Sequence, residues 1–266
     1  PTLNWFDFQI KYIETDRKSH AYGIGLHTHN EFELYINLSG DVSFLVENNL
    51  YDLSRGDVII ARPGEYHHCV YRSDAPHKLF WILFDCQKNK DILDFLKDGF
   101  RENYISPQGD LREELIDVCD ALHHRSLTNE EKIYAFFRLF AILKQSKNAI
   151  SAKSVLPQDL YKIMDYIDCY IHEEITITDI AKALYISQST LERRFKEALD
   201  MTPLEYIRKK KLILAAEMLQ HGESVLTAGT SVGYNDSSYF IELFKRYYGI
   251  TPYQYKKYHN KNNKSR

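Results

Sequence analysis

The chain has 266 residues and a formal net charge of −3. Its composition, 44% hydrophobic and 27% charged, is typical of a globular protein and excludes a largely disordered one. No run of about 18 apolar residues occurs, so we expect no membrane-spanning helix. The first residues also lack the basic-then-apolar pattern of a signal peptide. The length is sufficient for two domains.

Charge is distributed unevenly along the chain. Residues 1–150 hold 17 Lys and Arg against 23 Asp and Glu, a balance of −6, whereas residues 182–266 hold 15 against 8, a balance of +7. A basic C-terminal part indicates contact with a polyanion such as nucleic acid, although ordinary solvated helix faces would give the same count.

The four cysteines are scattered along the chain, at Cys69, Cys86, Cys119 and Cys169. None belongs to a Cys-x-x-Cys pair, so their spacing favours reduced thiols over a disulfide framework or a cysteine-rich zinc site. We therefore expect a cytoplasmic protein.

The N-terminal part is predicted to consist of short strands. Between residues 20 and 86 lie the β-rich runs FELYINL, VSFLVE, DVIIARP, HHCVYR and KLFWILF, separated by turn signals such as Ser39-Gly40-Asp41. Short strands at this spacing predict a small barrel or sandwich. The segment Trp5–Phe8 is either an arm that closes over a pocket or a first edge strand.

Helical periodicity follows in residues 91–100, 109–124 and 129–147. The second of these segments carries a narrow apolar seam, which either pairs two subunits or packs on its own domain. The seam consists of Leu111, Leu115, Val118 and Leu122.

A domain boundary is expected in residues 148–158, which lack periodicity and contain Pro157. Beyond it, nearly every segment up to about Tyr258 is predicted to be helical. The expected fold is α+β, with a small β-barrel or sandwich followed by helices in a domain of residues 1–150 and an all-α domain of residues 151–266.

The helical part contains a two-copy repeat, in residues 175–207 and 224–255. Leu191 and Phe195 of the first copy match Phe240 and Phe244 of the second. Two copies joined by one helix are two modules rather than a solenoid.

Each copy has the pattern of a helix-turn-helix. In the first copy Thr176 and Asp179 predict a capped helix, Ile186 fills the turn, and Ser187 or Ser189 caps a second helix. The inner face of that second helix is Leu191, Phe195 and Leu199.

The outward faces of the two second helices carry short polar and basic residues. Short polar residues at the start of such a helix suit base edges in the major groove, and cations suit phosphates. The candidate DNA contacts are Gln188, Ser189, Thr190, Arg193 and Lys196 in the first copy and Ser237, Ser238, Tyr239, Lys245 and Arg246 in the second.

These features identify residues 158–258 as similar to the double helix-turn-helix domain of the AraC-type (arabinose-regulator) transcription regulators. The run from Val232 to Lys257 is close to the family signature. The resemblance implies two recognition helices about one DNA turn apart, joined by a rigid helix over roughly 203–220. It also implies promoter DNA, RNA polymerase and a second copy of the chain (a homodimer) as partners.

The second copy departs from the family pattern. Ala228 stands where a large aliphatic residue is usual, and Gly229 stands at the small position that follows it. We therefore expect the second module to be packed more loosely than the first. Glu242 occupies the place of Arg193, which weakens contact with DNA there.

The N-terminal part resembles a cupin. His27, His29, Glu33 and then Gly40 have the spacing of the first cupin motif, and the run from Arg55 to His67 resembles the second. The resemblance implies a sensor barrel that binds a small-molecule effector. Its predicted effector-binding residues are His27, His29, Glu33, Tyr35 and His67.

Three interpretations of this polar strand face stay open. In metal cupins the equivalents of His27, His29, Glu33 and His67 hold a divalent ion, and this donor set suits zinc, iron, manganese or nickel. Alternatively, the same side chains line a sugar-sized cavity; this is the interpretation we favour, with no metal or other cofactor. In the third, the polar face is exposed and the apolar face of Phe32, Leu34 and Ile36 forms the core.

The sequence thus predicts a bacterial, cytoplasmic, sequence-specific DNA-binding regulator that is not an enzyme. We expect an activator that responds to a carbohydrate. One alternative is a metal-dependent cupin sensor or enzyme fused to a DNA-binding domain. Another is a constitutive DNA-binding protein whose barrel only dimerises.

Overall fold

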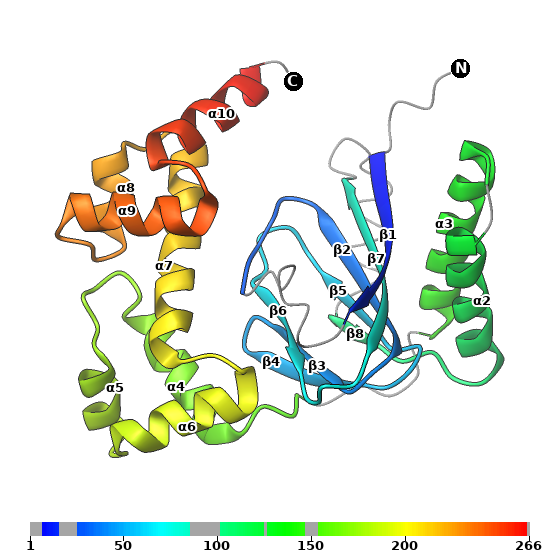
Figure 1. Ribbon diagram of the computed structural model, residues 1–266, viewed down its shortest axis with the longest axis horizontal. Coiled ribbons are helices and arrows are strands. Elements are labelled where there is room, and N and C mark those ends of the chain that lie inside the picture. The colour runs from blue at the N-terminus through cyan, green and yellow to red at the C-terminus, as the bar shows by residue number, and fades with distance from the viewer. Residues whose placement is uncertain (1–6, 16–25, 86–101, 125–126, 147–153, 265–266) are drawn as a thin grey trace. The chain divides into compact units, whose positions relative to one another are not determined.

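The computed structural model describes residues 7–15, 26–85, 102–124, 127–146 and 154–264. The chain divides into two compact units, an N-terminal unit of residues 1–155 and a C-terminal unit of residues 156–266 (Figure 1). The predicted helix at 91–100 lies outside the described residues, as do Trp5, Phe6 and Cys86. Among the described helices, none combines the length and apolar character that crossing a membrane requires.

The N-terminal unit contains two antiparallel sheets, which Figure 1 shows facing each other. The first sheet has the order β1 (Asp7–Thr15), β7 (His77–Asp85), β2 (Phe32–Ser39), β5 (Val58–Ala61) and β8 (Tyr104–Ile105). The second has the order β4 (Asn49–Leu53), β3 (Val42–Val46) and β6 (His67–Tyr71). The described strands therefore pair as two sheets, and their pairing does not show closure into one barrel.

β1 lies at the edge of the first sheet, where it pairs along the whole of β7. Asp7 and Phe8 belong to it, so the edge-strand alternative is correct for these two residues. The tight turn between β2 and β3 also matches its sequence signal. Gly40 there has φ +110, and a Cβ on it would lie 3.0 Å from the Cα of His77, so the turn requires glycine.

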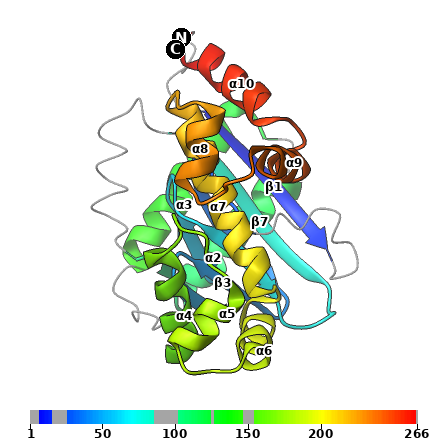
Figure 2. The same ribbon diagram turned by 90° about the vertical axis from the view of Figure 1, so that its left-hand side faces the viewer.

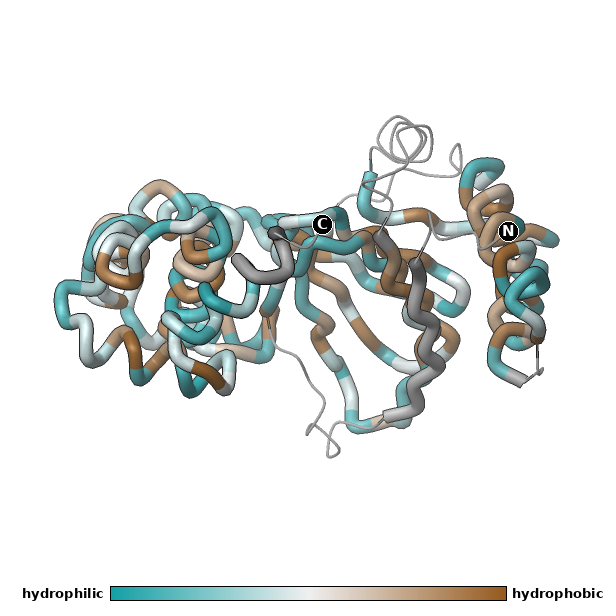
Figure 3. Tube along the Cα trace, turned by 90° about the horizontal axis from the view of Figure 1, so that it is seen from above, coloured by the Kyte–Doolittle hydropathy of each residue, from teal (hydrophilic) through white to brown (hydrophobic). Residues whose placement is uncertain are grey.

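Successive side chains of β2 point into two different layers of the unit. Figure 3 shows the alternation of hydrophobic and hydrophilic positions along the strands. One face, Phe32, Leu34 and Ile36, belongs to a core cluster shared with α2 (Asp110–His124) and α3 (Asn129–Gln145). The opposite face carries Glu33 and Tyr35, which are buried as well. The interpretation with an exposed polar face is therefore wrong, because helices cover one face and the second sheet covers the other.

The apolar seam of α2 packs on its own domain. Leu115 is fully buried in the core cluster, and Leu111, Val118 and Leu122 are partly buried against it. Of the two alternatives for this seam, the structure supports packing within the chain.

The C-terminal unit is entirely helical where it is described. Its helices are α4 (Gln158–Cys169), α5 (Ile177–Ala183), α6 (Gln188–Leu199), α7 (Pro203–Gln220), α8 (Val225–Ser231), α9 (Ser237–Tyr248) and α10 (Pro252–Lys264). α7 runs between the α5–α6 pair and the α8–α9 pair (Figures 1 and 2), as predicted for the connecting helix. Its 18 residues make it about 27 Å long.

Side-chain caps define the starts of several of these helices. Thr176 and Asp179 form the predicted capping box of α5, and Thr202 and Glu205 form another at α7. Of the two candidates for the cap of α6, the structure uses Ser187, whose side chain accepts a hydrogen bond from the backbone N–H of Thr190. The first module, α5 and α6, thus has the predicted helix-turn-helix form, and α8 and α9 form the second module.

Candidate functional site

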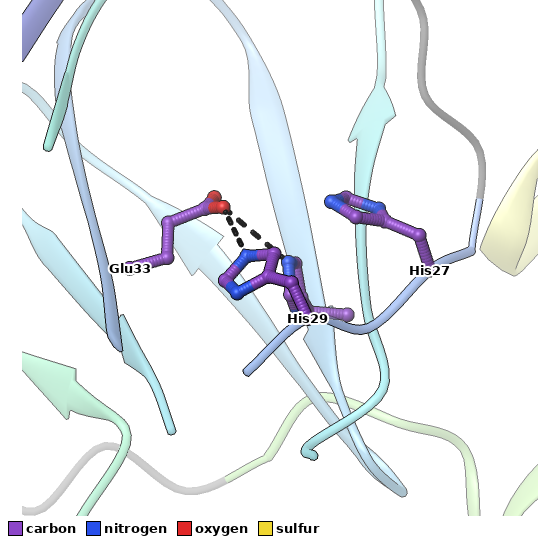
Figure 4. A group of neighbouring side chains, drawn as sticks. His27, His29 and Glu33 are labelled. Atoms are coloured by element: carbon purple, nitrogen blue, oxygen red, sulfur yellow. Dashed lines mark hydrogen bonds and ion pairs between the residues drawn. The ribbon is translucent and has the colours of Figure 1, made fainter. Parts of the chain in front are cut away.

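Four of the five predicted effector-binding residues come together in the N-terminal unit. His27, His29, Glu33 and His67, here called the acid–imidazole cluster, each offer one ligand atom, and these atoms lie within 4.8 Å of one another. Figure 4 shows the imidazole of His29 turned toward the Glu33 carboxylate, with His27 beside it. Backbone hydrogen bonds of 3.1 and 3.0 Å between His27 and His67 tie the segment before β2 to the start of β6.

Two imidazoles of the cluster are oriented by backbone carbonyls. Nδ1 of His29 lies 2.9 Å from the carbonyl oxygen of Glu31, and Nδ1 of His67 lies 2.9 Å from that of Glu65. A carbonyl can only accept, so both Nδ1 atoms carry a hydrogen. Nε2 of each ring is therefore directed at the same Glu33 oxygen, Oε2, at 2.9 Å for His29 and 3.4 Å for His67.

The electrostatics of Glu33 follow from this arrangement. Glu33 is 4% exposed and His67 is completely buried. Burial by itself raises the pKa of the Glu33 carboxyl, but hydrogen bonds from His29 and His67 and the neighbouring positive charge bring it well below its ordinary value. Burial lowers the pKa of His67, but the Glu33 carboxylate outweighs it and raises that pKa above the ordinary value. The buried Glu33 carboxylate is thus ionised, and the protonated form of His67 stabilises it.

The same geometry fits a divalent metal ion. Three imidazoles and one carboxylate form a donor set for zinc and similar ions. Carbonyl acceptors for Nδ1 are the usual supports of metal-bound histidines. The cluster therefore has two chemically reasonable states, a proton-bridged acid–imidazole network and a metal-ligand set.

Tyr35 does not join the cluster. Its hydroxyl lies 2.5 Å from Nε2 of His77 and 3.5 Å from Sγ of Cys69, and the side chain is 3% exposed. The ring of Phe44 contacts those of Tyr35 and His67, with centroid distances of 4.6 and 6.2 Å. Tyr35 thus lies between the sheets on the same face of β2 as Glu33, and its assignment to the effector site stays a prediction.

His77 and Cys69 were missed by the sequence argument. Burial lowers the pKa of His77 to about 4 and raises that of Cys69 to about 12, so both are neutral at pH 7. Neither residue belongs to a motif, and alternation along β6 and β7 is the only sequence signal that places them between the sheets. The interior around them is aromatic, with Tyr35, Phe44, Tyr51, Tyr71, Trp81 and Tyr104 in one cluster.

The predicted DNA contacts lie on α6 and α9, and nearly all are exposed. Thr190 is half-buried, because its hydroxyl lies 2.8 Å from that of the Ser187 cap. The exposed ones are Gln188, Ser189, Arg193, Lys196, Ser237, Ser238, Tyr239, Lys245 and Arg246. The structure thus leaves the side chains that were assigned to DNA accessible.

Carboxylates within the same helices pair with several of the basic side chains. Arg193 lies 3.0 Å from Glu197, and Arg246 lies 2.8 Å from Glu242, both as exposed i, i+4 pairs. The adjacent Arg194 has a different role, because it pairs with Asp159 of α4 and so fixes α6 to the body of the unit. The sequence analysis assigns only Arg193 to DNA, and the structure leaves Arg193 exposed and Arg194 half-buried.

The core of the second module has no empty space beside Gly229 of α8. Ala228 is fully buried, and a Cβ on Gly229 would lie 2.9 Å from the ring of Phe240. Phe240 stands where the first module has Leu191, so a larger side chain on α9 fills the space beside Gly229. The structure therefore contradicts the expected looser packing at Gly229.

Comparison with known proteins agrees with this architecture. Residues 10–158 match the AraC-like ligand binding domain and residues 180–258 match a helix-turn-helix domain. The lactose operon transcription activator of Staphylococcus xylosus is 22% identical over 98% of both chains. The HTH-type transcriptional activator RhaR of Mannheimia succiniciproducens is 24% identical over 92% of this chain and 91% of its own.

Among solved structures, ToxT from Vibrio cholerae O395 is 16% identical and covers 94% of this chain and 96% of its own, with a TM-score of 0.37. The match to the ligand-binding domain spans more than half of the sequence, and the helix-turn-helix match follows it. The chain therefore belongs to the AraC-type family of transcription regulators, with a ligand-binding domain and a helix-turn-helix DNA-binding domain.

Proposed function

We propose that this regulator is a cytoplasmic transcription activator, without enzymatic activity, whose effector is a small carbohydrate. Residues 1–150 bind the effector and residues 151–266 bind promoter DNA. The observation that carries the proposal is the acid–imidazole cluster beside an aromatic interior. Sugars offer hydroxyl edges to such polar groups and C–H faces to aromatic rings. The names of two relatives, a lactose operon transcription activator and a transcriptional activator, support the same assignment.

The cluster provides both kinds of hydrogen-bonding group that a sugar hydroxyl needs. The Glu33 carboxylate offers acceptor oxygens, and the imidazole of His67, whose pKa is raised by that carboxylate, offers a donor in its protonated form. An effector hydroxyl that enters this network replaces part of it and so changes the relative energy of two arrangements of the chain. Regulation follows if the effector binds these arrangements unequally.

A melting experiment tests effector binding. A panel of mono- and disaccharides is added to the full chain, and a true effector at 100 times its Kd adds about 2.7 kcal/mol of stability. His29→Ala removes the shift, whereas His123→Ala, which changes an exposed histidine of α2, keeps it. A panel without any shift, or a shift that survives His29→Ala, contradicts the assignment.

A metal-dependent sensor is the second candidate, favoured by the close approach of the four ligand atoms. His27, His29, Glu33 and His67 would hold the ion, which would serve as a Lewis acid for effector oxygens. Elemental analysis of chain purified without chelators or a metal column separates the two candidates. Stoichiometric metal, together with loss of the sugar-induced melting shift on chelation, supports this candidate, and metal-free chain that retains the shift supports the first.

For DNA, we propose that α6 and α9 are the recognition helices, with RNA polymerase and a second copy of the chain as further partners. The contacts are the exposed residues named above on the two helices, together with Thr190. Because each neutralised phosphate adds about −0.9 to the slope of log affinity against log salt, binding should weaken steeply with salt. An affinity that does not depend on salt would contradict this interface.

A further inference from the structure

One hydrogen bond links the first helix of the first module to the start of its recognition helix. Nε2 of Gln188 donates to Oγ1 of Thr178 at 2.7 Å. Thr178 is the second residue of α5 and Gln188 is the first residue of α6. Both side chains are exposed, so the bond lies on the surface of the module at the end of α6 where short polar side chains gather.

The bond leaves a defined part of the Gln188 carboxamide available. A carboxamide has one acceptor oxygen and two N–H donors. One N–H is used by Thr178, so the oxygen and the second N–H remain side by side. In the major groove, adenine presents one donor, N6, and one acceptor, N7, which this pair matches, whereas guanine presents two acceptors.

We propose that Thr178 is a positioning residue that holds the Gln188 carboxamide for readout of one adenine. This inference rests on the proposed assignment of α6 to the major groove. An unrestrained glutamine side chain loses rotamer entropy when it is fixed on DNA. A side chain that is held before binding avoids much of that cost. Base preference in the first module is thus set partly by a residue outside the recognition helix.

The second module has no counterpart of this bond. The position two residues after the helix cap, Thr178 in the first module, is Leu226 in the second, and it is 62% exposed. The first residue of α9 is Ser237 in place of Gln188. A leucine side chain has no hydrogen-bonding group, so this way of holding a base-reading side chain belongs to the first module.

A selection experiment on the full chain tests the proposal. The chain is used to enrich a pool of duplex oligonucleotides with randomised bases, and affinities are then measured for the enriched duplex and for each single base-pair change. Gln188→Ala should abolish the preference at one A·T pair. Thr178→Val, which keeps the shape but removes the hydroxyl, should reduce the preference at that same pair by about 3- to 10-fold, the value of one neutral hydrogen bond. Thr178→Ser should restore it.

The double variant separates positioning from a general structural effect. If Thr178 acts through Gln188, then Thr178→Val has no further effect on that preference in the Gln188→Ala background. A Thr178→Val variant that retains full preference, or one that loses preference equally at all pairs, overturns the proposal. Arg193→Ala is the reference for the interface: if it changes neither affinity nor preference, the assignment of α6 has failed, and the readout by Gln188 fails with it. If Arg193→Ala alters binding while Thr178→Val does not, only the inference on Thr178 has failed.

Discussion

The two helix-turn-helix modules fill the same core in different ways. In the first, Ile180 and Ala181 of α5 lie in a core with Leu191 of α6. In the second, the corresponding helix has Ala228 and Gly229, and Phe240 occupies the space. At Gly229 the smaller residue on the first helix is therefore matched by a larger one, Phe240, on the second. A sequence comparison that scores one helix at a time will mistake such an exchange for a defect.

The turns of the modules share a backbone conformation but have different surroundings. Tyr185 in the first turn has φ +56 and is 96% exposed. Gly233 in the second has φ +76, and a Cβ on it would lie 2.5 Å from the carbonyl oxygen of Glu173. The first turn faces solvent and accepts a bulky residue at the cost of some strain. The second turn is pressed against the backbone before α5, so it accepts only glycine.

The largest expected effect is that of Gly233→Ala. The left-handed conformation and the collision with the Glu173 backbone together should destabilise the C-terminal unit by about 2–4 kcal/mol. The matched change Tyr185→Gly should alter stability by less than about 1 kcal/mol, because relief of strain is offset by greater freedom of the unfolded chain. Hydrogen exchange of the α8 and α9 amides measures the first change, and that of the α5 and α6 amides measures the second. Similar losses at the two positions would show that the second turn is not confined.

The next effect concerns DNA affinity and compares Arg193 with Glu242. Arg193→Ala should cost about 1–3 kcal/mol and relax one base preference if the side chain reads guanine. If it contacts only phosphate, the loss should be uniform across sequences and the salt slope should shrink by about one. Glu242→Ala should cost less or tighten binding, since it removes a negative charge near the DNA. Titration of one duplex at two salt concentrations measures both; equal losses would mean that the second module reads DNA as firmly as the first.

The third effect concerns the stability of the second module, where the large Phe240 packs against the small Gly229. Gly229→Ala alone should destabilise α8 and α9 by about 1–2 kcal/mol, because overpacking against Phe240 exceeds the gain in helix propensity. Adding Phe240→Leu recreates the pairing of Ala181 with Leu191 and should recover part of that loss, with a coupling of at least about 0.5 kcal/mol. The converse pair, Ala181→Gly with Leu191→Phe, is the control. If the losses of stability measured by hydrogen exchange are additive, the two residues do not compensate each other in volume.

Sequence rules were sufficient where structure depends on neighbours along the chain. The capping box of Thr176 was predictable because caps are local, and Ser187 was one of two candidates for the cap of α6. The span of α7 was implied by the resemblance to AraC-type regulators. The spacing of His27, His29 and Glu33 predicted the acid–imidazole cluster through its resemblance to a cupin motif.

The remainder depended on partners distant in sequence. Alternation correctly placed Tyr35 on the face of β2 that carries Glu33, but it could not show that its hydroxyl pairs with His77 of β7. Likewise, the sequence of α8 alone does not indicate that the Phe240 side chain packs against Gly229. Contacts across sheets and between helices are decided by packing in three dimensions, which motifs do not encode.

The smallest expected effect comes from the ion pairs on the recognition helices, which have opposite polarity. Arg193 precedes Glu197 in α6, whereas Glu242 precedes Arg246 in α9. An acidic residue four positions before a basic one is the more stabilising order in a helix, because it agrees with the helix dipole. Glu242→Gln should therefore cost about 0.3–0.5 kcal/mol of stability at low salt, and Glu197→Gln should cost less. Calorimetric melting of the two variants at low and high salt measures this difference, which salt should remove. Both changes should in addition tighten DNA binding, because each removes a negative charge beside an arginine assigned to DNA, Arg193 or Arg246. Equal costs in stability and no change in DNA affinity would show that the reversed polarity has no consequence, and the two helices would then differ only in the residues that reach DNA.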